Sequence, residues 1–158
     1  MQILVALIWL LSLAGTAHSY SSCSDTAAEL QIRSKLSLYA IAVDTKDFGL
    51  LVEVFTQNAI ADYSAPPPNN IYRGLPAIQE FLKFSVNTSV TQHTISSTVV
   101  DFTNIFSPNS TAYVVANCLG QGNLTGQTLF IYGKYMDQWA YESGSWKTKN
   151  RHFTLFVS

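Results

Sequence analysis

The second half of the chain alternates between long β-prone runs and short turn segments, and this pattern restricts the fold more than any other feature. Val, Ile, Thr, Phe and Tyr are enriched in four segments, which are residues 91–106, 111–121, 128–142 and 146–157. The connections between them are short and rich in Ser, Pro, Asn and Gly, which favour turns. Consecutive strands joined by short connections pair antiparallel. The sequence therefore predicts a four-stranded antiparallel meander.

Helical periodicity dominates the region before these strands. Apolar residues recur three to four positions apart at residues 26–43, in a short segment after Asp47, and in a segment that begins at residues 74–76. A short strand at residues 59–63 and a proline-rich loop at residues 64–73 separate the second segment from the third. The expected fold class is α+β, with three N-terminal helices packed on one face of a strongly curved, mainly antiparallel sheet.

The first residues have the pattern of an export signal. Residues 3–13 are apolar and uncharged, and small residues follow up to Ser19. This run is too short to span a bilayer but has the length of a signal-peptide core. We expect a signal peptide at residues 1–17, with cleavage after residue 17 or 19, and a single secreted domain at residues 20–158. The alternative is a buried N-terminal helix. No later segment has the length and apolarity of a membrane anchor.

Two further features favour secretion. Three Asn-x-Ser/Thr sequons lie at expected turns or element ends, and their asparagines are Asn87, Asn109 and Asn123. The only two cysteines are Cys23 and Cys118, which would form a disulfide in an oxidising compartment. The alternative is a buried free thiol at Cys118. Two cysteines without a nearby histidine do not make a structural zinc site, so we expect no metal.

The composition narrows the class of partner. Nine Lys and Arg residues against ten Asp and Glu give a net charge of −1, which argues against nucleic acid as a partner because no basic surface is available for phosphates. A hydrophobic fraction of 47% excludes a disordered chain. Aromatic residues make up 13% of the chain, enough to line an apolar cavity as well as fill a core. The composition is therefore that of a folded domain with enough aromatic side chains to enclose an apolar cavity.

Asp44 and His93 are the best candidates for chemistry. Asp44 follows the apolar stripe at the end of the first expected helix, and His93 lies near the start of the first long strand. If Asp44 accepts a hydrogen bond from one ring nitrogen of His93, the tautomer is fixed and the other nitrogen is free to take a proton from a substrate. The phenol of Tyr63 could polarise a carbonyl. The alternative is a buried structural hydrogen bond between Asp44 and His93.

Several other side chains are candidates for the wall of a pocket. Four large aromatic residues are expected in the core and also at the pocket wall: Phe55, Phe81, Phe102 and Trp139. Strand parity places Asp137 on the same face as Trp139, where it either orients a substrate hydroxyl or bonds to a neighbouring strand. Arg73 and Arg151 are expected to bind carboxylates of loops or of the sheet rather than a substrate. The sequence contains no nucleophile elbow, dinucleotide-binding fingerprint, P-loop or zinc-protease motif.

Short segments of the chain resemble the NTF2-like superfamily, and within it the SnoaL-like and scytalone dehydratase-like group. The resemblance is carried, in order, by YAIAVDTKDF at residues 39–48, ADYS at 61–64, GLPAI at 74–78, TQH at 91–93 and YMDQW at 135–139. It implies a cone of helices on a curved sheet and a cofactor-free lyase, isomerase or cyclase acting on a small polyketide- or terpenoid-like molecule. It also implies that His93 is the base, Asp44 supports it, and Tyr63 engages the substrate oxygen through water.

The chain departs from the dehydratase pattern at several positions. Val43 stands where the dehydratase has a tyrosine, no second histidine occurs near residues 119–121, and the serine and asparagine expected near residues 134–136 are missing. Scytalone is therefore not expected as the substrate. Two non-enzymatic alternatives remain, which are a module that binds a ligand in the same cone without turnover and a secreted interaction protein whose pocket is filled by its own aromatic side chains. The resemblance leaves open a homo-oligomer formed through the convex face of the sheet.

Overall fold

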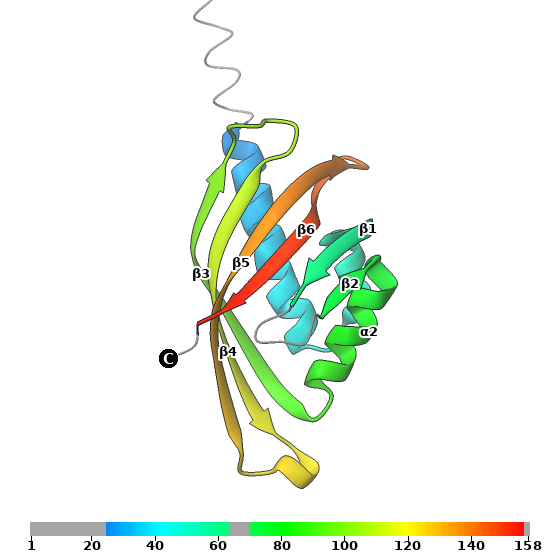
Figure 1. The fold of residues 1–158 in the computed structure, drawn as a ribbon, viewed down its shortest axis with the longest axis vertical. Coiled ribbons are helices and arrows are strands. Elements are labelled where there is room, and N and C mark those ends of the chain that lie inside the picture. Colours follow the sequence, from blue (N-terminus) through cyan, green and yellow to red (C-terminus); the bar gives the residue numbers. More distant parts are fainter. Residues whose placement is uncertain (1–24, 64–69, 157–158) are drawn as a thin grey trace, which may run out of the picture.

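The computed structural model describes residues 25–63 and 70–156 (Figure 1). The expected signal peptide, its cleavage sites and Cys23 lie outside the described residues. The chain begins with a helix over residues 25–44, which we call the N-terminal helix. The other elements follow in the order η1 (Phe48–Glu53), β1 (Phe55–Asp62), β2 (Ile71–Arg73), α2 (Leu75–Val86), β3 (Ser89–Asp101), β4 (Asn109–Gly120), η2 (Gly122–Leu124), β5 (Thr128–Glu142) and β6 (Ser145–Leu155).

The six strands form one open, strongly bent sheet in the order β2-β1-β6-β5-β4-β3 (Figure 1). Strands β3 to β6 pair antiparallel with their sequence neighbours, which confirms the predicted meander. Strand β1 pairs antiparallel with β2 and parallel with β6, so the sheet is mixed. The α+β class is confirmed, as is the mainly antiparallel sheet.

The expectation of three helices at the N-terminal end is not confirmed. The N-terminal helix agrees closely with the predicted segment, but the second segment is the 3-10 helix η1, and α2 follows two strands rather than preceding the sheet. The predicted loop at residues 64–73 is wrong for Ile71–Arg73, which forms β2. This short segment is a strand because β1 offers it an edge for pairing, with Ile60 opposite Arg73 and Asp62 opposite Ile71.

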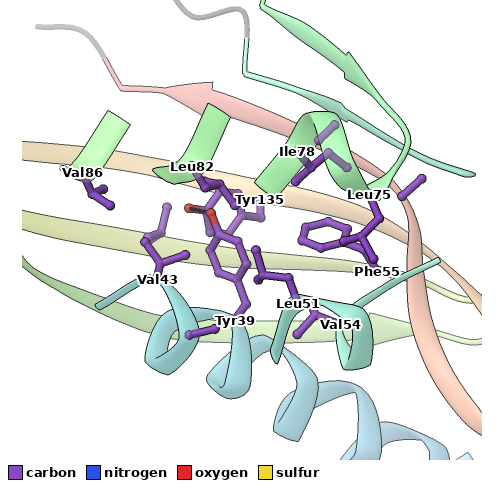
Figure 2. Close-up of a cluster of buried hydrophobic side chains, with 14 residues drawn as sticks. Tyr39, Val43, Leu51, Val54, Phe55, Leu75, Ile78, Leu82, Val86 and Tyr135 are labelled. Atoms are coloured by element: carbon purple, nitrogen blue, oxygen red, sulfur yellow. Dashed lines mark hydrogen bonds between the residues drawn. The ribbon is translucent and has the colours of Figure 1, made fainter. Parts of the chain in front are cut away.

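Both long helices pack on the same face of the sheet. Helix α2 buries one stripe, which consists of Leu75, Ile78, Leu82 and Val86. Figure 2 shows this stripe facing Tyr39 and Val43 of the N-terminal helix, with Tyr135 of the sheet and Phe55 between them. Among the described residues, no helix has the length and apolarity needed to cross a membrane.

A second, smaller core lies further toward the start of the N-terminal helix. It contains Ile32 and Leu36 of that helix together with Ala112 and Trp139 of the sheet. Side chains therefore fill the space between this half of the helix and the sheet. The β4–β5 hairpin extends beyond the helices at the other end of the fold (Figure 1). The candidate site lies toward that side, because Leu124 and Leu129 at this end of the fold line its cavity.

Candidate active site

A cavity of about 510 Å³ lies between the two helices and the sheet. Its wall is mostly apolar, and it includes Val43, Leu82, Val86, Val114 and Leu129. Its polar lining includes the imidazole of His93 and a group of three phenols, those of Tyr39, Tyr63 and Tyr135. The other polar residues of the wall are Ser85, Ser89, Cys118, Gln127 and Thr128. An apolar cavity of this size with a few polar groups is the usual form of a site for a small organic molecule.

The carboxylate of Asp44 accepts three hydrogen bonds from β3. It accepts from Nδ1 of the His93 ring at 2.6 Å, from the His93 backbone N–H at 2.7 Å and from the Thr91 hydroxyl at 2.9 Å. Asp44 is the last residue of the N-terminal helix, and Thr91 and His93 share the inward face of β3 because they are two positions apart. The predicted contact between Asp44 and His93 is confirmed.

This arrangement determines which nitrogen of His93 is available. A carboxylate only accepts hydrogen bonds, so Nδ1 carries the proton and Nε2 is the free acceptor. The His93 side chain is 10% exposed and lines the cavity, while Asp44 stands behind it at 21% exposure and does not line the cavity. Together these groups form an oriented imidazole that can accept a proton from a molecule in the cavity.

The hydrogen-bond donors around Asp44 keep its carboxylate ionised. Burial by itself would raise the pKa of the Asp44 carboxyl, but the hydrogen bonds from His93 and Thr91 outweigh it and lower that pKa below its ordinary value. The ammonium of Lys46 donates to the Thr91 hydroxyl at 3.3 Å. Burial lowers the pKa of Lys46, although Asp44 and Cys118 act in the opposite direction. The carboxylate therefore remains an acceptor for His93 at neutral pH.

The three phenols form a hydrogen-bonded chain. The hydroxyls of Tyr39 and Tyr63 are 3.3 Å apart, and the hydroxyl of Tyr135 donates to that of Tyr39 at 3.5 Å. Burial is the main cause that raises the pKa of all three phenols well above the ordinary value. They stay protonated at physiological pH and act as donors rather than as bases. The ring of Tyr39 also meets the ring of His93 edge-on, with centroids 6.4 Å apart.

The structure thus brings the three predicted side chains to one place. His93 and Tyr63 both line the cavity, and Asp44 orients His93 from behind. Sequence reasoning missed Tyr39, Tyr135 and Thr91. Their signal was present in part, because Tyr135 shares strand parity with Asp137, and Thr91 shares it with His93.

Most of the predicted pocket wall is wrong. Phe81 lines the cavity, but Phe55, Phe102, Trp139 and Asp137 do not. Phe55 is buried in the main core, and Phe102 and Trp139 belong to the second core. The Trp139 indole N–H donates to the Ser110 hydroxyl at 2.9 Å. These residues pack against the helices where side chains already fill the space.

Asp137 is also occupied within the core. It accepts two hydrogen bonds from Arg151, at 2.8 Å from Nε and 2.6 Å from Nη2, and both side chains are fully buried. The prediction that Arg151 binds a carboxylate of a loop or of the sheet is confirmed, and the carboxylate is one of the sheet. The alternative role of Asp137, orienting a substrate hydroxyl in the cavity, does not fit this geometry because the carboxylate is already paired with a cation.

Cys118 is a free thiol that lines the cavity, and Cys23, the partner in its predicted disulfide, lies outside the described residues. Cys118 pairs with Thr91 across β3 and β4, beside the end of the N-terminal helix.

The three sequon asparagines, Asn87, Asn109 and Asn123, are all exposed, at the end of α2, the start of β4 and within η2. Among the described residues, no three His, Cys, Asp or Glu side chains are grouped in a way that could hold a metal ion.

Comparison with known proteins identifies relatives of this geometry. A family model described as a SnoaL-like domain matches residues 24–152. A scytalone dehydratase-like protein from Novosphingobium aromaticivorans has a TM-score of 0.75 at 20% identity, over 86% of this chain and 89% of that one. A type 2 hexachlorocyclohexane dehydrochlorinase, LinA, has a TM-score of 0.70 at 16% identity, over 88% and 90%. ActVI-ORFA from Streptomyces coelicolor has a TM-score of 0.66 at 16% identity, over 80% and 96%. At these identities the likeness establishes a shared fold. No curated protein matches the sequence.

Proposed function

The chain belongs to the SnoaL-like domain family of the NTF2-like superfamily, and on that premise we propose that it is a lyase, isomerase or cyclase that needs no cofactor. Its substrate is a small hydrophobic molecule of the polyketide or terpenoid type. The names of the structural neighbours support this class of chemistry, since they include a dehydratase-like protein and a dehydrochlorinase.

One observation carries the proposal. The Asp44 carboxylate holds Nδ1 of His93 at 2.6 Å, and the imidazole lines an apolar cavity large enough for a small organic molecule. In the proposed reaction Nε2 of His93 removes an activated proton from the substrate. Asp44 keeps the ring in the required tautomer and stabilises the imidazolium that forms. The low polarity of the cavity strengthens this charge interaction by excluding water.

Tyr63 supplies the second half of the chemistry in this proposal. Its phenol lines the same cavity and stays protonated because burial raises its pKa. A protonated phenol can donate a hydrogen bond to a substrate oxygen as negative charge develops on it. After proton transfer the imidazolium of His93 returns the proton to a leaving group or to another carbon, which gives elimination or isomerisation.

A non-catalytic binding module is the alternative function. It is favoured by the hydrogen bonds of Asp44, which already satisfy the carboxylate without any ligand. In that case the same cavity binds a small apolar molecule, and the Asp44–His93 pair only holds the N-terminal helix against β3.

The two functions are separated by a base-catalysed reaction of a small apolar probe. In 5-nitrobenzisoxazole, removal of the C–H proton by a base breaks the N–O bond and releases a coloured phenolate, so the assay needs no knowledge of the natural substrate. His93→Gln should lower kcat/KM by at least about 100-fold, the usual contribution of a general base. His152→Gln is the matched control, because His152 is exposed and outside the cavity, and it should stay within about twofold.

The result that would contradict catalysis is equally direct. If the wild-type protein opens the probe no faster than free imidazole at the same concentration, or if His93→Gln retains the wild-type rate, the binding module is the better description. Native mass spectrometry of protein purified from its own host would then identify the molecule that the cavity retains.

We also propose that the domain is secreted. The apolar stretch at residues 3–13 and the three exposed sequon asparagines support this. Expressed in a eukaryotic host, the protein should appear in the medium without its first 17 to 19 residues, and glycosidase treatment should lower its mass. A cytosolic, unglycosylated product that retains Met1 would contradict the proposal.

A further inference from the structure

The phenol chain contains one hydroxyl proton more than its internal hydrogen bonds use. Tyr135, Tyr39 and Tyr63 together have three O–H groups, and two hydrogen bonds join them. One proton is therefore left for a partner outside the chain. Tyr39 and Tyr135 are 1% and 4% exposed, whereas Tyr63 is only partly buried. Tyr63 is therefore the least buried member of the chain, and it lines the cavity.

A buried cation supports the two inner phenols. The guanidinium of Arg151 lies 4.2 Å from the ring centroid of Tyr39 and 4.1 Å from that of Tyr135. Asp137 holds the guanidinium in place through two hydrogen bonds, and both charged side chains are fully buried. A desolvated cation against an aromatic ring is attracted to the ring and fixes its position. Arg151 also partly offsets the rise in the pKa of each phenol that burial causes, which strengthens their O–H groups as donors.

We propose that Tyr135 and Tyr39, supported by the Arg151–Asp137 pair, form a hydrogen-bond relay that directs the Tyr63 hydroxyl proton at an oxygen atom of the substrate. Tyr135 donates to Tyr39, Tyr39 donates to Tyr63, and Tyr63 donates to the ligand. Hydrogen bonds aligned in this way strengthen one another. Tyr39, Tyr135, Arg151 and Asp137 are positioning residues in this scheme, and Tyr63 is the group that touches the substrate.

The relay defines the substrate class, and in this respect it rests on the proposed function. In this scheme the acceptor is Nε2 of His93, which Asp44 orients, and the donor is the Tyr63 hydroxyl, which the relay orients. The matching molecule has an acidic C–H group next to a carbonyl. His93 takes the proton of the C–H bond, the electron pair forms a C=C bond, and the carbonyl π electrons move to the oxygen, which becomes an enolate oxygen bound by Tyr63. The imidazolium then protonates a departing β-hydroxyl, which leaves as water, or a different carbon.

The test measures equilibrium binding and needs no turnover. The probes are 4-nitrophenol, held above its own pKa so that it is an oxyanion, and 4-nitrotoluene, which has nearly the same shape without the oxygen. Calorimetric titration gives the ratio of the two affinities. Tyr63→Phe should lower the preference for the oxyanion by about tenfold or more, the usual value of a hydrogen bond to a charged group. Tyr39→Phe, which keeps the ring over Arg151 and removes only the O–H, should lower it about three- to tenfold.

Two further variants separate positioning from structural support. Tyr113→Phe is the matched control, because Tyr113 lies on the outward face of β4, and it should leave the ratio unchanged. Asp137→Leu combined with Arg151→Met removes both buried charges at once, so that no unpaired ion is left to unfold the protein. This double variant should lower the preference about threefold.

The outcomes are distinct. If Tyr39→Phe and the double variant weaken both probes equally, or change neither affinity, the relay is wrong and these residues are only structural. If His93→Ala removes the oxyanion preference and Tyr39→Phe does not, the oxygen is bound by the imidazole and the relay is again wrong. Failure of the proposed function looks different, since in that case 5-nitrobenzisoxazole is not opened while the affinity ratio still responds to the tyrosine variants.

Discussion

Among the described residues, two histidines pair with aspartates, in two different regions of the molecule. His93 meets Asp44 at 2.6 Å beside the cavity, and His152 meets Asp62 at 3.1 Å on the outward face of the sheet. The His93 side chain is 10% exposed and the His152 side chain 48%. The same two residue types thus occur in the same pairing with different surroundings.

Strand parity produces the difference. His93 is on the inward face of β3, so its ring reaches the cavity and the end of the N-terminal helix. His152 follows Arg151, which takes the inward position on β6, and its ring therefore points away from the helices. A His–Asp pair becomes a candidate base only when its free nitrogen faces enclosed space. Pairing alone does not distinguish the two.

The largest expected effect is on turnover. The distinction between the two pairs would be wrong if turnover depended on His152–Asp62 rather than on His93–Asp44. Asp44→Asn should lower kcat/KM for 5-nitrobenzisoxazole by about 10- to 100-fold, less than loss of His93, because the amide keeps the size of the side chain but can hold the wrong tautomer. Asp62→Asn is the matched control and should stay within about twofold. Equal losses in the two variants would mean that both act through stability.

The next effect is on the free energy of unfolding, and it tests whether Asp44 contributes more through its hydrogen bonds than Asp62 does. Asp44 accepts three hydrogen bonds from β3, and its removal leaves the Thr91 hydroxyl and the His93 N–H without this acceptor. Asp44→Ala should lower the free energy of unfolding by about 2 kcal/mol. Asp62→Ala should lower it by at most about 1 kcal/mol, as for exposed ion pairs. Urea unfolding curves of both variants check this, and a larger loss for Asp62→Ala would contradict it.

Sequence patterns predicted the strands of this site and its Asp44–His93 pair better than the residues of its cavity wall. The meander followed from turn residues and strand composition, and Asp44 and His93 were found because each lies near the end of a strongly patterned element. The wall failed because parity gives the face of a strand but not the position along the helix. Trp139 faces inward, yet it does so opposite Ile32 and Leu36, where the space is full.

Contacts between residues far apart in the sequence were the other feature that sequence patterns did not predict. Asp137 and Arg151 stand opposite each other across β5 and β6, and this register depends on a bulge between Gln138 and Trp139 that no local pattern indicates. The hydrogen bond from Tyr135 to Tyr39 joins residues 96 positions apart.

A smaller effect concerns stability at acidic pH, and it tests whether Asp44 of the His93–Asp44 pair is ionised. The pKa of the Asp44 carboxyl is lowered in the folded protein, so its ionised form is favoured more strongly there than in the unfolded chain. The resulting stabilisation is present above the unfolded pKa of about 4 and is lost as pH falls through the lower folded pKa. Unfolding free energies measured from neutral pH into this acidic range should therefore fall more for the wild type than for Asp44→Asn. Parallel curves would show that the carboxylate is not stabilised by its donors.

The smallest expected effect is at the exposed His152–Asp62 pair. His152→Ala should change the free energy of unfolding by no more than about 0.5 kcal/mol. The reason is exposure, since water can replace the imidazole at Asp62, and the 3.1 Å contact joins side chains that are 48% and 28% exposed. The same variant should open 5-nitrobenzisoxazole at the wild-type rate, because its ring is outside the cavity. Thermal unfolding and the probe assay on one preparation measure both quantities. A clear loss of activity without a loss of stability would mean that the outer face contributes to the chemistry, and the distinction between the two pairs would then have to be abandoned.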